Sequence, residues 1–274
     1  MRVSLTVVTG LATAIALVST GSAAARDGED VALQRAVEEG LRPAVTVRGE
    51  PPRTLSLDAR MRNYRVPGVS IAVIEGNRLV WAKGYGVRAI GDAAVAPETL
   101  FQAASMSKPV AAAASLTLVD QGRIDLDAPA NASLKQWQLP SSAVASATEV
   151  TLRLLLSHSA GLTVHGFRGY ATGGAVPSVP QLLNGVKPAN SAPVRIDLRP
   201  GSQWRYSGGG STIAQLMVED VTGMPFTDAA DALVLRPVGM TASGYLQPLP
   251  PARVSQAAIG HDATGEAVAG GWNV

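Results

Sequence analysis

The chain contains no cysteine among its 274 residues, and this absence removes several kinds of chemistry at once. A structural disulfide, a thiol nucleophile and a lipid-modified N-terminal cysteine all need a residue that the sequence lacks. Charge is also scarce, because Asp, Glu, Lys and Arg make up 16% of the residues, below the usual quarter or so. No two Lys or Arg residues are adjacent, so the sequence offers no basic patch and we expect no nucleic-acid partner.

The N-terminus has an apolar run that is typical of an export signal. Arg2 precedes an uncharged stretch from Val3 to Val18, and Ala23 to Ala25 fit the small-x-small cleavage pattern. We predict a signal peptide over residues 1–25, with an uncleaved anchor as the alternative. The apolar run is short for a membrane span, and no later segment is long and apolar enough. The mature protein is therefore expected in the periplasm or outside the cell, without a stable membrane span.

Residues 26–274 are expected to form one domain, because 46% of the chain is hydrophobic and this is enough for one substantial core, or for one core with a smaller second lobe. β-branched residues on both sides of Gly76-Asn77 predict a β-hairpin with strands at about 69–75 and 78–87. Apolar periodicity and capping residues predict helices at 30–41, 55–66, 105–121, 151–160, about 179–186, 211–222 and 226–240. Thr151 is the expected N-cap of one helix, and Gly161 is expected just past its end.

The stretch FQAASMSKPVAAAASLTLVDQG, residues 101–122, places a hydroxyl and an amine at the start of an apolar helix. Ser105 and Lys108 are three residues apart, so they lie on one helix face. A lysine accepts a proton at pH 7 only if burial or nearby cations lower its pKa by about three units. The pattern predicts Ser105 as a nucleophile and Lys108 as its base. The alternative is that Ser105 caps the helix and Lys108 reaches solvent.

A second motif, RPGSQWRYSGGGSTIAQ, places Tyr206 directly before Ser207 and the glycines at 208–210. Glycines allow a ligand or another backbone to approach closely. A tyrosine at the edge of such a loop can carry protons if cations lower its pKa. The alternative is that the ring of Tyr206 simply packs beneath a flexible turn.

In their order and flanking residues, these motifs resemble the serine β-lactamase and penicillin-binding-protein superfamily. The resemblance is strongest to its class C-like branch of β-lactamases, D-amino-acid-releasing peptidases and carboxylesterases. It runs from about residue 60 to 271, through VPGVSIAVIEGNRLVWAKGYGV, TLFQAASMSKPV, DQGRIDLDAPA, LRLLLSHSAGL, RPGSQWRYSGGGSTIAQLMVEDVTG and LRPVGMTASGY. The resemblance implies an α/β (α+β) fold with an antiparallel sheet flanked by helices, plus a helical subdomain.

The resemblance also implies the chemistry. Ser105 would be acylated, its backbone N–H would form half of the oxyanion hole, and Lys108 and Tyr206 would share the proton transfers. Which of the two is the general base is disputed for such enzymes. No metal or organic cofactor is implied. Contacts to a small-molecule or short-peptide substrate are expected from Ser207, Gly208 and His165.

The sequence departs from the family pattern at two places. Gly208 stands where the family has the Asn of Y-x-N, which contacts substrate amide groups in β-lactamases, so efficient β-lactam turnover is less expected. The family's third box, Lys or His followed by Thr, Ser or Gly and then Gly, does not occur after Gly210. Relatives continue beyond VAGGWNV, so we expect a C-terminally truncated chain that lacks the last strands of the sheet.

The predicted function is that of an exported serine hydrolase acting through an acyl-enzyme. Its substrate would be a β-lactam, a D-amino-acid peptide or a carboxylic ester. The missing third box motivates an alternative, namely a non-catalytic protein that binds penicillin or peptidoglycan peptides, or an inactive truncated copy.

Other catalytic constellations find less support in the sequence. No serine lies in a G-x-S-x-G pattern, which disfavours an α/β-hydrolase with a Ser-His-Asp triad. His158, in LLSHSAGL, is interpreted as a structural residue at a helix end. The three histidines are not clustered in the sequence as metal ligands would be. Asn131-Ala132-Ser133 matches a glycosylation acceptor but is interpreted as a polar loop.

Overall fold

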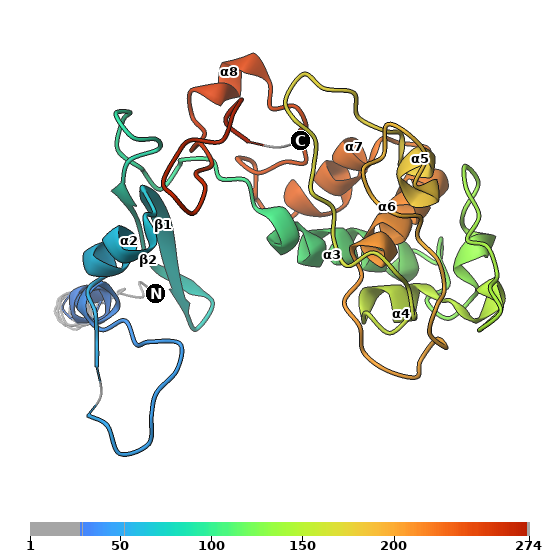
Figure 1. The fold of residues 1–274 in the computed structure, drawn as a ribbon, viewed down its shortest axis with the longest axis horizontal. Coiled ribbons are helices and arrows are strands. Elements are labelled where there is room, and N and C mark those ends of the chain that lie inside the picture. Colours follow the sequence, from blue (N-terminus) through green and yellow to red (C-terminus); the bar gives the residue numbers. More distant parts are fainter. Residues whose placement is uncertain (1–27, 29, 52, 273–274) are drawn as a thin grey trace, which may run out of the picture. The chain divides into compact units, whose positions relative to one another are not determined.

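The computed structural model describes residues 28, 30–51 and 53–272 (Figure 1). The predicted signal peptide, residues 1–25, lies outside this part. Within it, no helix combines the length and the hydropathy that crossing a membrane requires. The chain divides into two compact units, which are described separately. Unit 1 comprises Met1–Thr99 and His261–Glu266, and unit 2 comprises Leu100–Gly260 and Ala267–Val274.

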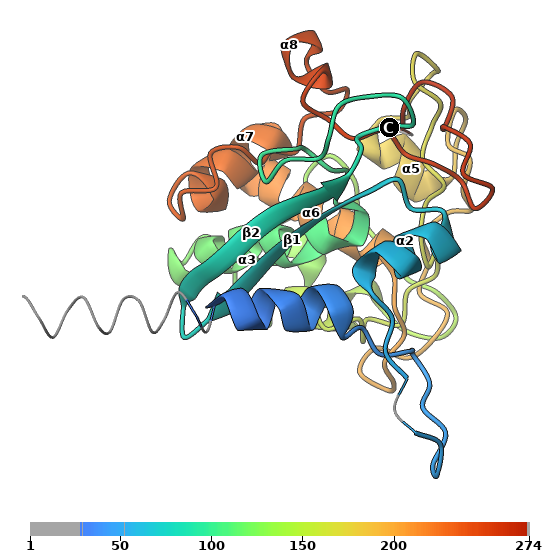
Figure 2. The ribbon, with the colours of Figure 1, turned by 90° about the vertical axis from the view of Figure 1, so that its left-hand side faces the viewer.

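Unit 1 contains an antiparallel β-hairpin, which Figure 2 shows as two adjacent arrows. Strand β1 (Gly68–Glu75) pairs with strand β2 (Arg78–Gly86). The connecting residues Gly76 and Asn77 have φ angles of 54° and 59°, which is the left-handed pair that a tight two-residue hairpin turn requires. The predicted hairpin is therefore confirmed, with its strand ends shifted by one residue.

Helices in unit 1 also follow the sequence prediction. Helix α2 (Leu57–Tyr64) begins after Ser56, whose hydroxyl accepts from the backbone N–H of Ala59, and ends at Arg65 with a φ of 53°. Residues 30–39 form a further helix. Its Glu38 accepts hydrogen bonds from Lys83 and Tyr85, each over 2.8 Å, and thereby ties this helix to β2.

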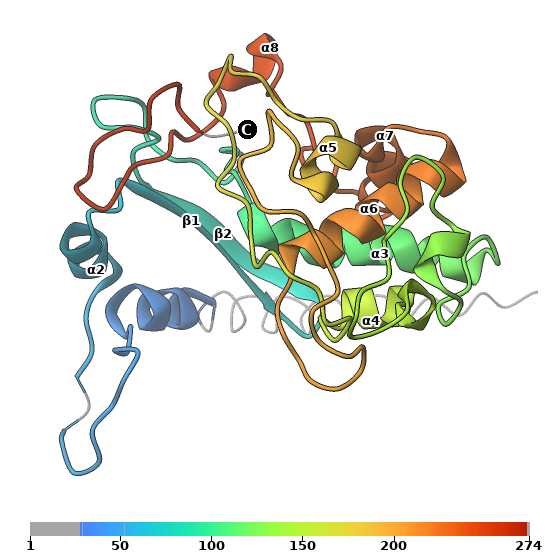
Figure 3. The same ribbon diagram turned by 45° about the vertical axis from the view of Figure 1, so that its right-hand side comes forward.

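Unit 2 is built from short helices around a common core. Helix α6 packs against α3, α4, α5 and α7, and Figure 3 shows α3 and α6 side by side. The helices of this unit are α3 (Ser107–Asp120), α4 (Leu152–Leu156), α5 (Val179–Asn184), α6 (Gly208–Thr222), α7 (Phe226–Ala230) and α8 (Pro251–Val254). A π-helical turn, Asp231–Leu235, continues α7.

Apolar side chains of α3 and α6 fill the centre of unit 2. Leu118 from α3 and Ile213, Leu216 and Met217 from α6 are all buried. These three α6 positions recur at helical spacing, so one face of α6 is apolar and buried. The carboxylate of Asp220 is buried near the C-terminal end of α6 and accepts hydrogen bonds from residues 135 and 136.

Most helix ends differ from the sequence prediction by a few residues, and the helix predicted at 226–240 is α7 with its π-helical turn and ends at Leu235. Three of the displaced ends lie near Ser105, His158 or Tyr206. Helix α3 begins at Ser107, so Ser105 lies in the preceding 3-10 turn (Ala104–Met106). Helix α4 starts after its predicted cap but ends at Leu156, not near Gly161, because His158 adopts a left-handed φ of 56°. The glycines at 208–210 form the first turn of α6, although glycine is a poor helix former.

Candidate active site

The turn that carries Ser105 is held in an uncommon backbone conformation. Ala104 has a φ of 45°, in the left-handed region that costs a residue with a Cβ roughly 1–2 kcal/mol. The hydroxyl of Tyr245 donates to the carbonyl of Ser107, which anchors the start of α3. Ser105 itself is exposed at this turn. Backbone strain next to an exposed hydroxyl is frequent at functional sites.

Two side chains from different segments converge on the hydroxyl of Ser105. Lys108 Nζ donates to Ser105 Oγ over 2.9 Å, and the hydroxyl of Tyr206 donates to the same oxygen over 3.0 Å. The ammonium of Lys108 also lies 5.1 Å from the centre of the Tyr206 ring. The structure thus brings together the three residues predicted to be catalytic, within the distances that nucleophile activation needs.

These contacts disfavour the purely structural roles that the sequence also allowed for Ser105, Lys108 and Tyr206. Ser105 does not act as the N-cap of α3, because Met106 holds that position and no side chain caps the helix there. Lys108 is half-buried rather than extended into solvent. The hydroxyl of Tyr206 forms a hydrogen bond with Ser105, so Tyr206 does more than pack its ring beneath a turn. The catalytic roles remain predictions that this geometry permits.

The electrostatics of the cluster favour the phenolate form of Tyr206. The hydrogen bond with Lys108, followed by that with Ser105, lowers the pKa of the Tyr206 phenol below its ordinary value of 10. Burial opposes this shift only partly, and the charge of Lys108 adds to it. A lowered pKa makes the phenolate more accessible at neutral pH, which is what a proton acceptor for the serine requires.

Two imidazoles pack on the same phenol. The ring of His158 lies 4.4 Å from that of Tyr206, and the ring of His165 lies 4.8 Å from it. His158 therefore belongs to the site, whereas the sequence analysis interprets it only as a structural residue at a helix end. The signal that would have identified it is spatial, because nothing in LLSHSAGL indicates a contact with residue 206. Within the described residues, no three His, Asp or Glu side chains are grouped as metal ligands.

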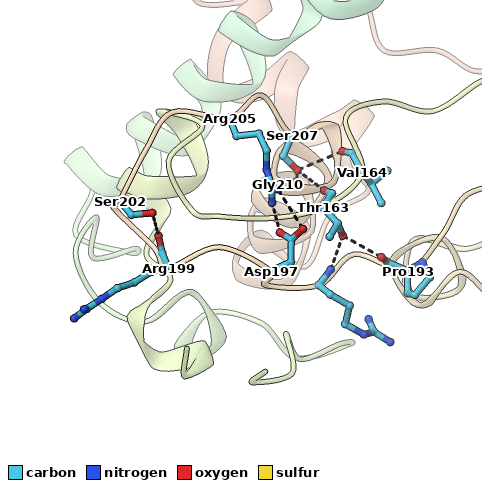
Figure 4. Close-up of polar contacts among 10 residues, drawn as sticks. Thr163, Val164, Pro193, Asp197, Arg199, Ser202, Arg205, Ser207 and Gly210 are labelled. Atoms are coloured by element: carbon cyan, nitrogen blue, oxygen red, sulfur yellow. Dashed lines mark hydrogen bonds and ion pairs between the residues drawn. The ribbon is translucent and has the colours of Figure 1, made fainter. Parts of the chain in front are cut away.

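Ser207, predicted to contact substrate, has its hydroxyl in the interior (Figure 4). It donates to the carbonyl of Thr163 over 2.8 Å and accepts from the backbone N–H of Gly210 over 3.0 Å. The first bond fixes the segment around residue 163, and the second caps α6. This placement leaves the predicted substrate contact of Ser207 without geometric support. His165, by contrast, is exposed beside Tyr206, and its predicted substrate contact remains open to test.

Gly208 is also buried, and its surroundings would crowd a side chain at this position. A Cβ at this position would lie 3.0 Å from the carbonyl oxygen of His165 and 3.2 Å from Cα of Gly166. The backbone N–H of Gly208 donates to that same carbonyl over 3.0 Å. The segment at residues 165–166 therefore occupies the space into which an Asn side chain at position 208 would project.

The triplet that matches a glycosylation acceptor, interpreted above as a polar loop, takes part in hydrogen bonds within the fold. Asn131 donates from Nδ2 to the carbonyl of Leu139 and accepts through Oδ1 from the N–H of the same residue, each over 2.9 Å. Both polar groups of this amide are therefore committed to one backbone position, as a structural polar loop requires.

Comparison with known proteins identifies one matching family and several similar proteins. The family described as Beta-lactamase matches residues 55–273. Esterase EstB of Burkholderia gladioli is 31% identical over 204 residues, which cover 70% of this chain and 50% of the esterase. An unguisins hydrolase of Aspergillus campestris is 30% identical over 189 residues, which cover 66% of this chain and 33% of the hydrolase. The chain thus spans half or less of the length of these relatives.

A solved structure gives the same result for the fold. The octameric penicillin-binding protein homologue from Pyrococcus abyssi superimposes with a TM-score of 0.59 at 25% sequence identity. The match covers 78% of this chain and 49% of that protein. The predicted fold class, with an antiparallel sheet and helices of the β-lactamase and transpeptidase type, is therefore confirmed.

Proposed function

Because the chain belongs to the Beta-lactamase family, we propose that it is an exported serine hydrolase that cleaves ester or amide carbonyls through an acyl-enzyme on Ser105. The observation that carries this proposal is the convergence of Lys108 Nζ and the Tyr206 hydroxyl on Ser105 Oγ, at 2.9 and 3.0 Å. Export rests on the sequence pattern of residues 1–25. Since the chain spans only part of its relatives' length, the activity is proposed for the whole protein.

In the first half-reaction, Ser105 Oγ attacks the carbonyl carbon while its proton passes to the Lys108–Tyr206 pair. The tetrahedral oxyanion collapses, the bond to the leaving group breaks, and the leaving group takes the proton from the pair. In the second half-reaction, a water molecule gives its proton to the pair and attacks the acyl carbon. Ser105 then regains a proton as the acid departs. Proton transfer by positioned groups contributes typically 10²–10⁴-fold to the rate.

The lowered pKa of Tyr206 supports a proposal in which the two partners have different parts. The phenol exchanges the proton with Ser105, and Lys108 holds the phenolate by a hydrogen bond and by its charge. This division does not require the amine to give up its own proton in the ground state. It therefore suits a site in which Lys108 is only half-buried.

Carboxylic esters are the substrate class that the site favours. Gly208 supplies no amide where the β-lactamases that the chain resembles have an Asn that contacts substrate amides, and a Cβ at this position would be crowded by the segment at residues 165–166. EstB, which is 31% identical, bears the name of an esterase. An ester also has a better leaving group than an amide, so it places the smaller demand on proton donation in the first step. D-amino-acid peptides and β-lactams rank after esters.

One observation favours a second candidate, a protein that is acylated but turns over slowly. The sequence after Gly210 has no Lys or His followed by Thr, Ser or Gly and then Gly. Relatives carry the other oxyanion N–H on the strand with this box. A protein without this box would lack one oxyanion donor, so it would form and hydrolyse its acyl-enzyme slowly.

A substrate panel distinguishes the two candidates. We expect short-chain nitrophenyl esters to be hydrolysed faster than a chromogenic cephalosporin or a D-alanyl dipeptide, and activity to vanish in Ser105→Ala. Ser107→Ala, two residues along the same turn, is the matched control and is expected to keep its activity. A single burst of nitrophenol without turnover would indicate the slow binder. Equal hydrolysis by wild type and Ser105→Ala would contradict both.

A further inference from the structure

We propose that His158 is a positioning residue for Tyr206, and that it holds the phenol in place only as a neutral imidazole with its proton on Nε2. The inference rests on the proposed function, because it concerns the side chain that would exchange the proton of Ser105. It goes beyond that function by giving a role to a residue that touches neither Ser105 nor the substrate.

Three contacts join His158 to the segment that carries Tyr206. The backbone N–H of Ser207 donates to Nδ1 of His158 over 3.3 Å. The backbone N–H of Arg205 donates to the carbonyl of His158 over 2.8 Å. The two rings of His158 and Tyr206 pack 4.4 Å apart at a tilt of 34°. The residues before and after Tyr206 and its own ring are therefore all held by one residue.

The contact with Ser207 depends on the protonation state of the imidazole. A backbone N–H can only donate, so Nδ1 of His158 must offer its lone pair. In a neutral ring the single proton then lies on Nε2. A second proton would occupy Nδ1 and set a donor against a donor, which breaks the hydrogen bond. Protonation of His158 would thereby release Ser207 and, with it, the placement of Tyr206.

The surroundings of His158 oppose that second proton. The titratable and charged groups near it are Lys108, His165, Tyr206 and the ion pair of Arg205 with Asp197. Burial first, and then the charges of Lys108 and His165, lower the pKa of His158 below 6.5. A histidine with a lowered pKa stabilises the fold fully above pH 6.5 and loses this contribution as the pH falls through its folded value. At neutral pH the holding form is therefore the one present.

The backbone at position 158 allows a matched pair of variants. Its φ of 56° is in the left-handed region, which Asn and Gly both adopt readily. His158→Asn places an amide oxygen near the position of Nδ1, where it accepts from Ser207. His158→Gly keeps the backbone but supplies no acceptor. Neither replacement titrates near neutral pH. The two variants therefore separate the effect of the hydrogen bond from Ser207 from the effect of a positive charge at position 158.

The first measurement is the rate at which a fluorophosphonate labels Ser105, followed from about pH 5 to 8. The reagent forms a P–O bond to Oγ and loses fluoride, and the serine proton leaves through the Lys108–Tyr206 pair to solvent. In the wild type, the labelling rate should fall as the pH is lowered. Above the pKa of His158 the rate should be inversely proportional to the proton concentration, and below that pKa it should be inversely proportional to the square of this concentration, so that the fall steepens. His158→Asn should keep its rate within about threefold and lose this steepening, whereas His158→Gly should lose about 10²-fold, as misplaced catalytic groups do.

The second measurement does not depend on activity. The chain has three histidines, so long-range proton–nitrogen NMR correlations can be assigned by His158→Asn and His261→Asn. We expect His158 as the Nε2–H tautomer, titrating below pH 6.5. His165→Asn should move this titration to higher pH, because it removes one of the charges that oppose the second proton.

The outcomes separate the inference from the proposed function. If no pH gives labelling, the proposed function fails, and the NMR tautomer still decides the state of His158. If labelling occurs but the steepening persists in His158→Asn, the positioning role is wrong. An Nδ1–H tautomer, or a titration at or above pH 6.5, would overturn the inference whatever the activity.

Discussion

Tyr206 is the residue at which the contacts of the site meet. Its hydroxyl reaches Ser105, its ring is 5.1 Å from the ammonium of Lys108, and two imidazoles pack on it. A phenol in bulk water has no reason to ionise at neutral pH, and here the contact with Lys108 is the largest cause of its lowered pKa. The chemistry proposed for Ser105 thus depends on how firmly one ring is held.

Gly208 gives a prediction at the same scale, because the family pattern has Asn at its position. We expect Gly208→Asn to gain no β-lactamase activity, to lower the melting temperature and to reduce ester hydrolysis. The added side chain would meet the carbonyl of His165 at 3.0 Å, so the segment beside Tyr206 would have to move. Differential scanning fluorimetry and the substrate panel measure these effects.

Gly173→Asn is the matched control for this replacement. Gly173 has a φ of 80°, and a Cβ there would meet nothing within 4 Å. Asn tolerates the left-handed region, so this variant should stay close to wild type. A Gly208→Asn protein that is as stable as the control and hydrolyses a cephalosporin would show that the segment at 165–166 does not block the position.

At the scale of single elements, sequence patterns predict the turns and helix ends that are determined by residues close together in the chain. The hairpin turn at Gly76-Asn77 and the cap of α4 at Thr151 both follow from local chemistry and are found where predicted. The end of α4 was missed because His158 takes a left-handed φ, for which the sequence carries no glycine. Its partner Ser207 is far along the chain, so no window of sequence could reveal the contact.

The start of α6 was missed for a related reason. Three consecutive glycines predict a loop from helix propensity alone. Here the side chain of Ser207 caps the helix at Gly210, and the glycines allow close packing: a Cβ at Gly209 would lie 2.6 Å from the side chain of Val194. Tertiary packing therefore outweighs propensity at the point where the chain leaves Tyr206.

Asp220 gives the prediction that belongs to this scale, because it joins α6 to the loop that follows α3. Its carboxylate accepts from the backbone N–H groups of Lys135 and Gln136, over 2.7 and 3.2 Å, and from Gln136 Nε2 over 2.8 Å. We expect Asp220→Ala to lower the free energy of unfolding by roughly 2–4 kcal/mol, since a hydrogen bond to a charged group contributes about 1.5–3 kcal/mol and water replaces part of this at exposed donors. Urea unfolding measures the change.

Asp228→Ala supplies the comparison for Asp220. Asp228 lies on α7 and is exposed, so its removal should change the free energy of unfolding by less than about 0.5 kcal/mol. If both variants unfold at the same urea concentration as the wild type, the carboxylate of Asp220 does not hold the loop at residues 135–136 to α6.

For the whole molecule, the family match and the cluster in unit 2 point to the same chemistry. The Beta-lactamase family covers residues 55–273, and the Ser105–Lys108–Tyr206 group lies entirely within Leu100–Gly260. The chain spans half of EstB. The sequence alone predicted these three residues through the order of several blocks, whereas neither Ser105-x-x-Lys108 nor Tyr206 would have been specific by itself.

The most direct test is to trap the acyl-enzyme. The protein is incubated with nitrophenyl butyrate, quenched in acid and mapped by peptide mass spectrometry, beside Ser105→Ala and Lys108→Arg. We predict one butyryl group on Ser105 in the wild type and none in either variant. Ser105→Ala has no nucleophile, and the planar guanidinium of Lys108→Arg cannot take the place of the compact ammonium beside Ser105 and the phenol. A butyryl group on another residue, or an equally acylated Lys108→Arg protein, would contradict the account.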